Sequence, residues 1–457
     1  MKNFNFYQIS DLHLYAAEEI GSHGQSFDFK CDTDQKCMAE SSAIIDAAFK
    51  KVIDDKENEV VILSGDLTFD GEKQGHDLLV KKLKTLKEAG KKVYVTFATH
   101  DFHMDARAYI DNSIYPVEKY TRDQLRQVYN DFGWSDAVSE HTPSYSYAVI
   151  PEKGWRFLML NDDGDAEEFC GYDESQLEWI KQQAEQAKTA GERIIAVTHH
   201  PALPPSVLYP IYSHKNMLGG YETTMPLFAD WGIQFIFTGH THMQSITYLD
   251  TENGNRIYHV NTGSIIAYPA PIRKVTATES GLDVKTTSID SFDWPLRSMT
   301  VSEYMKQHFE FMLKDIFYSL EYDIGHFRDL AGSFSLDEET VDKFKPLFVL
   351  AGKIINKLTI KSLARIVGVS SKVDPAAAKI KVKDLILELI CQMYSGVKLY
   401  TPDTPVYRSF MPIVEKIGKV VKLKDYEGNP VALEDIIGDL MYDTGEYDNT
   451  NTFLPYK

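Results

Sequence analysis

Two histidines, His240 and His242, directly follow an apolar run of the β type at residues 234–238. In an extended backbone, residues two positions apart point to the same side of the strand. Neutral imidazole is the side chain that most often binds metal ions in proteins. The pair therefore predicts a metal site at the end of a strand, although two ordinary histidines in a turn would give the same local pattern.

The same pattern occurs four more times upstream. Short β-rich runs end near residues 9, 63, 97 and 197, and a histidine or aspartate follows each of them. The residues so placed are Asp11, His13, Asp66, His100, Asp101 and His199. Because open α/β sheets bind ligands at the carboxyl ends of their strands, we expect these side chains to gather at one edge.

This set offers only nitrogen and oxygen atoms as ligands. Such a set suits Mn, Fe, Zn or Ni better than Cu(I) or an iron–sulfur cluster. It is larger than the three protein ligands of one catalytic zinc ion, but two ions about 3.5–4 Å apart that share a carboxylate would use it fully. Two divalent ions with two aspartates and one hydroxide leave a net charge of about +1, which would attract a phosphate.

In their order along the chain, these blocks resemble the calcineurin-like metallophosphoesterase superfamily. The blocks are Asp11-x-His13, Gly65-Asp66, Thr99-His100-Asp101, His199 before His-Pro, and Gly239-His240-x-His242. Residues 65–68, with Gly71-Glu72 after them, resemble the bacterial branch related to cyclic-nucleotide phosphodiesterases, and residues 262–264 fit as well. The five blocks lie across residues 11 to 242, and the resemblance implies an α/β fold, a sandwich of two mixed β-sheets flanked by helices.

The resemblance also implies an enzyme, a metal-dependent phosphoric ester hydrolase with two divalent or trivalent transition-metal ions. By resemblance, the first ion is held by Asp11, His13, Asp66 and His242, and the second by Asp66, residue 99, His199 and His240. His100 would help the leaving oxygen depart, and Asp101 would orient its imidazole. The implied reaction is attack of a metal-bound hydroxide on a small, cyclic-nucleotide-like phosphodiester. A phosphomonoesterase is the alternative within this class.

The third block departs from the family pattern Gly-Asn-His-Asp. Thr99 stands in the place of the asparagine, and Ala98 in the place of the glycine. A threonine hydroxyl is a shorter and poorer neutral ligand than an asparagine amide, and alanine restricts the backbone. We expect the second metal ion to be held more weakly, which leaves open a degenerate protein that binds metal or phosphate and has a regulatory role.

A second alternative concerns the ligand at the end of the fourth run. His199 and His200 are adjacent, and either imidazole is chemically suitable. We favour His199 because the family ligand comes first, before His-Pro. For the other candidates, the structural alternative is helix capping, turn chemistry or a hydrogen-bonded core histidine.

The chain divides into two parts by pattern. Residues 1–291 alternate strand runs with amphipathic helices, which indicates an α/β domain of the calcineurin-like type. Residues 292–457 have helical apolar periodicity, so we predict an all-helical C-terminal domain. Segments 15–36 and 102–134 lack a clear period and are predicted to be loops over the site. We further predict helices at 39–53, 70–89 and 173–189, and a β-hairpin over 144–160.

Composition limits the partners of the protein. Of its 457 residues, 43% are hydrophobic and 25% are charged, as in ordinary globular proteins. The net charge of −19 disfavours nucleic-acid polymers and anionic membranes, so the expected partner is a small phosphorylated substrate. No apolar run reaches the length of about 20 residues that a membrane span needs, and we predict a cytoplasmic protein with reduced cysteines. The apolar helical faces after residue 300 predict core packing or a homodimer surface.

Overall fold

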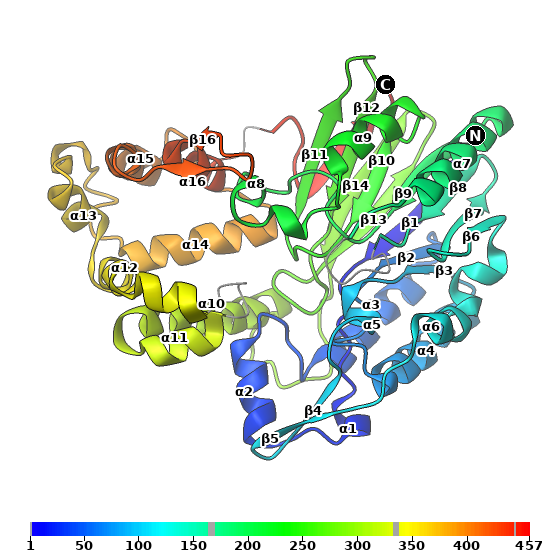
Figure 1. Ribbon diagram of the computed structural model, residues 1–457, viewed down its shortest axis with the longest axis horizontal. Coiled ribbons are helices and arrows are strands. Elements are labelled where there is room, and N and C mark those ends of the chain that lie inside the picture. Colours follow the sequence, from blue (N-terminus) through cyan, green and yellow to red (C-terminus); the bar gives the residue numbers. More distant parts are fainter. Residues whose placement is uncertain (1, 163–169, 332–337, 443–444) are drawn as a thin grey trace.

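The computed structural model describes residues 2–162, 170–331, 338–442 and 445–457. Two β-sheets lie side by side, and a group of helices from the last third of the chain lies to one side of them (Figure 1). The predicted fold class is confirmed: two mixed sheets flanked by helices, with an additional helical region at the C-terminal end.

The first sheet has six strands in the order β17-β14-β13-β1-β2-β3. Its strands are β1 (Phe4–Ile9), β2 (Val60–Ser64), β3 (Lys92–Thr96), β13 (Pro271–Ala277), β14 (Gly281–Ser288) and β17 (Asn451–Pro455). β1, β2 and β3 are parallel to one another, with Phe6 opposite Val60 and Val60 opposite Lys92. The carboxyl ends of these three strands therefore meet at one edge of the sheet.

The second sheet has seven strands in the order β11-β12-β10-β9-β8-β7-β6. Its strands are β6 (Ser139–His141), β7 (Ser146–Glu152), β8 (Trp155–Met159), β9 (Arg193–Val197), β10 (Phe235–Thr238), β11 (Ser245–Asp250) and β12 (Arg256–Asn261). β8, β9, β10 and β12 are parallel neighbours. β7 and β8 form the predicted hairpin.

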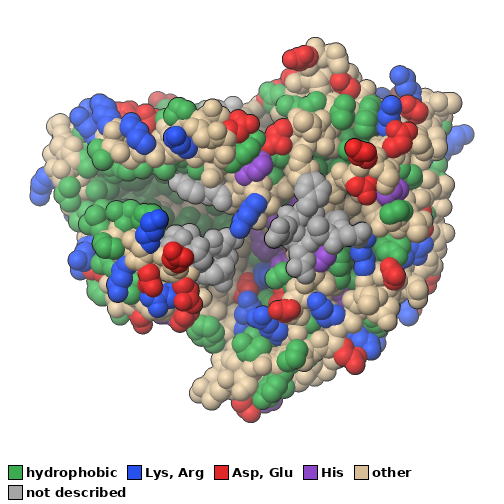
Figure 2. Space-filling model, viewed as in Figure 1, with side chains coloured by type: hydrophobic (Ala, Val, Ile, Leu, Met, Phe, Trp, Pro, Cys, Tyr) green, Lys and Arg blue, Asp and Glu red, His purple; other side chains and the backbone are tan. Residues whose placement is uncertain are grey.

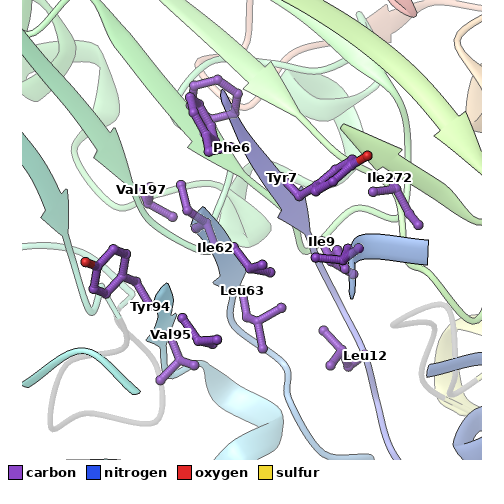
Figure 3. Close-up of a cluster of buried hydrophobic side chains, with 14 of the residues drawn as sticks. Phe6, Tyr7, Ile9, Leu12, Ile62, Leu63, Tyr94, Val95, Val197 and Ile272 are labelled. Carbon is purple, nitrogen blue, oxygen red and sulfur yellow. The ribbon is translucent and has the colours of Figure 1, made fainter. Parts of the chain in front are cut away.

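One large hydrophobic core holds the two sheets together. The ring of Phe6 in β1 contacts Phe157 and Phe237 of the second sheet, at centroid distances of 5.3 and 5.5 Å. Figure 3 shows Phe6 of β1, Ile62 of β2 and Val197 of β9 in this core. The five strand runs are apolar at nearly every position because helices cover their outer faces as well.

Helices cover the outer face of each sheet. α3 (Ser41–Asp54) and α4 (Lys73–Glu88) pack against the first sheet, and α7 (Glu174–Ala190) and α9 (Tyr221–Asp230) against the second. The three predicted helices correspond to α3, α4 and α7, and α7 begins at the capping residue Asp173 and ends at Gly191. Three shorter helices in this part of the chain are α5 (Thr99–Phe102), α6 (Arg122–Val128) and α8 (Tyr209–Tyr212).

The two segments predicted as loops contain regular structure. Residues 15–36 form α1 (Ala17–Ile20) and α2 (Gln25–Thr33), and residues 102–134 include α6 and the hairpin of β4 (Arg107–Ile110) and β5 (Ser113–Pro116). The loop prediction was wrong for α2 because none of its residues is buried, so no apolar stripe marks the helix in the sequence.

Most of the C-terminal region is helical. Its helices are α10 (Val301–Tyr322), α11 (Ile324–Ala331), α12 (Glu338–Lys357), α13 (Ile360–Ile366), α14 (Val382–Ser395), α15 (Pro405–Gly418) and α16 (Leu433–Met441). They are grouped together in Figure 1. Among the residues that the structure describes, no helix is long and apolar enough to cross a membrane.

The prediction that residues 292–457 are all helical needs a correction. β15 (Leu423–Lys424) and β16 (Pro430–Val431) form a small hairpin, and β17 returns to the first sheet, where it pairs with β14. Leu454 of β17 is fully buried in the common core. β17 is short and only this residue points fully into the core, so its sequence carries little strand pattern.

Candidate metal centre

Both sheets deliver candidate ligands to the same place. Asp11 and His13 follow β1, Asp66 follows β2, and residues 99–101 form the start of α5 after β3. From the second sheet, His199 follows β9, and His240 and His242 follow β10. The predicted gathering of these side chains at the carboxyl ends of the strands is therefore seen in the structure. Figure 2 shows histidine side chains near the middle of this face, with lysine or arginine side chains next to them.

The first cluster consists of Asp11, His13 and His242. His242 Nε2 lies 3.1 Å from His13 Nε2 and 3.4 Å from Asp11 Oδ1. Both oxygens of Asp11 accept a hydrogen bond from the backbone N–H of His240, which fixes this carboxylate between the two sheets. The three ligand atoms are within 4.8 Å of one another, close enough to hold one ion.

The second cluster consists of Asp66, His199 and His240. Asp66 Oδ2 is 3.1 Å from His199 Nε2 and 3.5 Å from His13 Nε2. One carboxylate oxygen therefore faces an imidazole of each cluster, as the carboxylate shared by two metal ions must. A third group, His13, Asp66 and His100, overlaps with both clusters.

The backbone of the ligands is unusual. Asp11, His13, Asp66, His240 and His242 have φ angles of 51°, 38°, 48°, 69° and 56°. Side chains other than glycine rarely adopt this left-handed region, and such strain concentrates at functional sites. Half of the ten described positions with positive φ other than glycine are candidate ligands. The fold therefore holds these residues against their local preference.

Hydrogen bonds set the orientation of two imidazoles. The His199 Nδ1–H donates to the carbonyl oxygen of Ser64 at 2.8 Å, so that Nε2 faces Asp66. The His100 Nδ1–H donates to the carbonyl oxygen of Phe69 and, at 2.9 Å, to Asp70. A fixed N–H on one side of the ring presents the other nitrogen to the site, which is the usual arrangement for metal-binding or catalytic histidines.

The chemistry of these groups fits metal ions. In the described part of the chain, the buried His199 Nε2 makes no well-aligned hydrogen bond, although Asp66 Oδ2 lies 3.1 Å away. The nitrogens of His13 and His242 that face each other at 3.1 Å cannot both present lone pairs without a proton or a cation between them. A cation at this place would satisfy His199 Nε2 and could separate the facing nitrogens of His13 and His242.

Electrostatics supports the same conclusion. Burial and the charges of neighbouring groups lower the pKa of His13 and His240 well below the ordinary value, so both are neutral and able to bind metal. Burial raises the pKa of Asp66, but His199 and His100 outweigh it and hold that pKa well below its usual range. Burial also lowers the pKa of His199, but Asp66 raises it to about 10. A bound metal ion would take the place of the proton on His199.

The structure contradicts the predicted contact between Asp101 and His100. The Asp101 carboxylate instead accepts hydrogen bonds from the backbone N–H groups of Leu67, Thr68 and Ala98. Asp101 is the third residue of the short helix α5. Its carboxylate caps the N-terminus of this helix and does not contact His100. Asp70 takes the orienting position beside His100.

Asp162 is a residue of the site that the sequence prediction missed. It follows β8 and accepts hydrogen bonds from the backbone N–H groups of His199 and His200 at 3.0 and 2.7 Å. It also forms an ion pair with His200 Nδ1 at 3.0 Å. The signal was present, because the apolar run at 155–160 ends in Asn-Asp just as the other runs end in His or Asp. His200 is thus directed to Asp162, and His199 to Asp66.

Thr99 is the first residue of α5 and is half-buried. Within the described chain, its hydroxyl makes no hydrogen bond to another residue, whereas the next backbone N–H, of His100, donates to Asp66 at 3.0 Å. Its role as a ligand stays a prediction.

The choice between the two adjacent histidines can be tested by metal content. We expect His199→Ala to reduce bound Mn²⁺ from about two ions to about one per chain, because it removes a ligand of the second cluster. His200→Ala serves as the matched control and should keep both ions, since its imidazole is paired with Asp162. Elemental analysis after dialysis measures this. Loss of metal from the His200 variant alone would reverse the assignment.

The two aspartates near His100 should have separate effects. We expect Asp70→Asn to lower kcat by about tenfold to a hundredfold with metal content unchanged, because outer carboxylates of this kind have effects of that size. Asp101→Ala should instead lower the free energy of unfolding by about 3 kcal/mol, because three buried N–H groups lose their acceptor. Steady-state kinetics and urea unfolding separate the two. A stability loss in Asp70→Asn without a change in kcat would contradict the positioning role.

Comparison with known proteins gives the family. The family model described as "Calcineurin-like phosphoesterase" matches residues 4–244. No curated protein sequence matches the chain significantly. Similar solved structures include a dimetal phosphatase from Danio rerio (15% identity, 65% of this chain and 98% of that one, TM-score 0.46). They also include the purple acid phosphatase PPD1 of yellow lupin (13% identity, 63% of this chain and 52% of that one, TM-score 0.41). A third is the NAD nucleotidase of Haemophilus influenzae (13% identity, 82% of this chain and 72% of that one, TM-score 0.32). Because the family model spans more than half of the chain, including every block of the candidate centre, the protein belongs to the calcineurin-like phosphoesterase family.

Proposed function

We propose that this chain is a dinuclear metal-dependent phosphoesterase that hydrolyses a small phosphodiester of the cyclic-nucleotide kind. The observation that carries the proposal is the position of Asp66. Its Oδ2 lies 3.1 Å from an imidazole nitrogen of one cluster and 3.5 Å from one of the other, so a single carboxylate is available to two ions. Membership of the family supports the reaction class.

In this proposal, the first ion is held by Asp11, His13, Asp66 and His242. The second is held by Asp66, His199 and His240, with Thr99 as its fourth protein ligand. When bound, such a pair supplies positive charge for the phosphoryl oxygens and lowers the pKa of an attacking water. The chain itself supplies fixed ligand orientation, through Ser64 for His199 and through the backbone of His240 for Asp11.

His100 is the proposed proton donor. Burial lowers the pKa of its imidazole, but Asp66 and Asp70 raise it more, so the net shift is upward. With Nδ1 held by Phe69 and Asp70, the proton on Nε2 is available to the ester oxygen as the P–O bond breaks. The ring lies next to that of His13, at a centroid distance of 4.7 Å, and is therefore beside the first cluster.

A phosphomonoester is the second candidate substrate. It is favoured by Lys36, whose positive charge suits a phosphoryl group with two negative charges. The Lys36 ammonium lies 4.3 Å from the centroid of the Phe69 ring, which is 6.3 Å from the ring of His13. The homodimer expected through the helical region stays a prediction.

Activity tests the proposal directly. Protein loaded with Mn²⁺ should hydrolyse bis(p-nitrophenyl) phosphate, and to a lesser extent p-nitrophenyl phosphate. Removal of metal with EDTA should abolish turnover and Mn²⁺ should restore it. Asp66→Asn should reduce kcat by more than about a hundredfold, beyond the range for outer-shell partners. Absence of turnover with either ester at every metal concentration would favour the degenerate, regulatory alternative.

Thr99 gives a separate prediction. If its short hydroxyl leaves the second ion weakly held, Thr99→Asn should tighten the weaker of the two Mn²⁺ sites by about tenfold, the size expected for one improved neutral ligand. Calorimetric titration of the metal-free protein with Mn²⁺ measures both sites, and Thr99→Ser is the control that keeps a hydroxyl. An unchanged second affinity in the asparagine variant would contradict this role.

A further inference from the structure

Lys36 is a buried lysine with an unusual environment. The residue is 8% exposed, and its ammonium lies 4.3 Å from the centroid of the Phe69 ring. The nearest carboxylate oxygen, Asp34 Oδ2, is 3.9 Å away, beyond hydrogen-bond distance. Among the described residues, none accepts a hydrogen bond from Lys36 Nζ. Burying an ammonium without such bonds is costly, and the cation–π contact with Phe69 offsets it only in part.

The only ion pair of Lys36 among the described residues is a long one, to Asp34 at 3.9 Å. Asp34 is shared by two lysines, and the closer one is Lys30, whose Nζ is 2.7 Å from Asp34 Oδ2. Burial raises the pKa of Asp34, but Lys36 and Lys30 outweigh it and hold that pKa well below its usual range. Lys36 thus shares the Asp34 carboxylate with a closer competitor, Lys30.

Lys36 lies near the metal centre, with the ring of Phe69 next to both. Phe69, which Lys36 contacts, lies with its ring 6.3 Å from that of His13, and its carbonyl oxygen accepts the hydrogen bond of His100. Lys36 is therefore on the side of the first cluster where His100 stands.

The segment that carries Lys36 is held in place from several directions. The His308 Nε2–H of α10 donates to the carbonyl oxygen of Asp34 at 2.9 Å, and the backbone N–H of Cys37 donates to Ile266 at 2.8 Å. The hydroxyl of Tyr304, also in α10, donates to Glu40. The ammonium is thus positioned before any substrate binds, which reduces the entropy lost on binding.

We propose that Lys36 is a specificity-determining residue that binds an anionic oxygen of the substrate's phosphoryl group beside the metal centre. This inference rests on the proposed phosphoesterase function. An ammonium binds phosphate as a point charge, and its attraction grows with the charge of the phosphate. Lys36 should therefore contribute more to binding a dianionic monoester than a monoanionic diester.

Substrate charge gives the kinetic test. Mn²⁺-loaded wild type, Lys36→Met and Lys36→Arg are compared on p-nitrophenyl phosphate, a dianion at pH 8, and on bis(p-nitrophenyl) phosphate, a monoanion. Lys36→Met should lose about tenfold in kcat/KM on the monoester, mainly through KM, and less than about threefold on the diester. The arginine variant, which keeps the charge, should stay within about threefold on both. Equal losses on the two esters, or no loss, would overturn the proposal.

Lys82→Met is the matched control. Lys82 is also buried (9% exposed), but it lies in α4, pairs with Asp46 at 2.6 Å and donates to the backbone of Ser42. Its replacement should leave the ratio of the two kcat/KM values unchanged. Stability separates the two lysines further. Removal of a buried charge that has no hydrogen-bond acceptor among the described residues should leave the melting temperature of Lys36→Met equal or higher, whereas Lys82→Met should melt lower. A lower melting temperature for Lys36→Met would mark Lys36 as a structural residue and overturn the proposal.

Binding of inorganic phosphate distinguishes this inference from the proposed function. Calorimetry of the Mn²⁺-loaded protein should give a Kd for phosphate about tenfold weaker in Lys36→Met than in wild type, with equal metal content. This measurement needs no turnover. If neither ester is hydrolysed but phosphate binding depends on Lys36, the proposed hydrolytic function is refuted and the role of Lys36 in binding phosphate is supported. If the esters are hydrolysed and the phosphate Kd is the same in both proteins, only the role of Lys36 fails.

Discussion

The structure depends on one buried carboxylate, that of Asp66, which is 2% exposed. It comes from the first sheet and faces His199 of the second, at 3.1 Å, while its other oxygen accepts the backbone N–H of His100. Removing a carboxylate from water is unfavourable unless charges and hydrogen bonds replace the lost hydration. Here imidazoles from both sheets do so, which requires the strand ends of the two sheets to meet at one edge. The packing of Phe6 against Phe157 and Phe237 brings the sheets into that position.

The close approach of the two sheets also limits which residues can follow the strands. Gly65 has φ of +88°, and a Cβ atom there would lie 2.6 Å from His199 Nδ1. A Cβ atom on Gly239 would collide with the side chains of Ser10 and Asp11. Each glycine stands directly before a candidate ligand, Asp66 or His240, whose own φ is positive. Glycine thus gives the space, and the packed core supplies the free energy that keeps the next residue in a strained conformation.

The sequence predicted the site where the signal was local and missed what depended on tertiary contacts. Strand runs that end in His or Asp identified both clusters, because a buried parallel strand and the residue after it are adjacent in the chain. The neighbour of His100 could not be predicted this way: Asp70 approaches it through the turn after β2, while the sequential neighbour, Asp101, is used by backbone N–H groups. Lys36 was not predicted as a site residue, because its segment has no periodic pattern and its contacts with Phe69 and Asp34 appear only in the folded chain. β17 was missed because its pairing partner, β14, is more than 160 residues away.

Helices of the C-terminal region contact segments on both sides of the site. On one side, His308 of α10 contacts Asp34 in the segment of Lys36. On the other side, Gln244, which is two residues after His242, donates its backbone N–H to the carbonyl oxygen of Tyr394 in α14 at 3.0 Å. The chain then returns to the first sheet as β17, next to Arg273, a fully buried guanidinium that donates to the backbone of Asn261 and Asn449. A division at residue 291 therefore follows the change in sequence pattern but cuts through these contacts. Helices after residue 300 thus hold segments next to the centre, while the hydrogen bonds that orient the ligands come from residues that follow the strands.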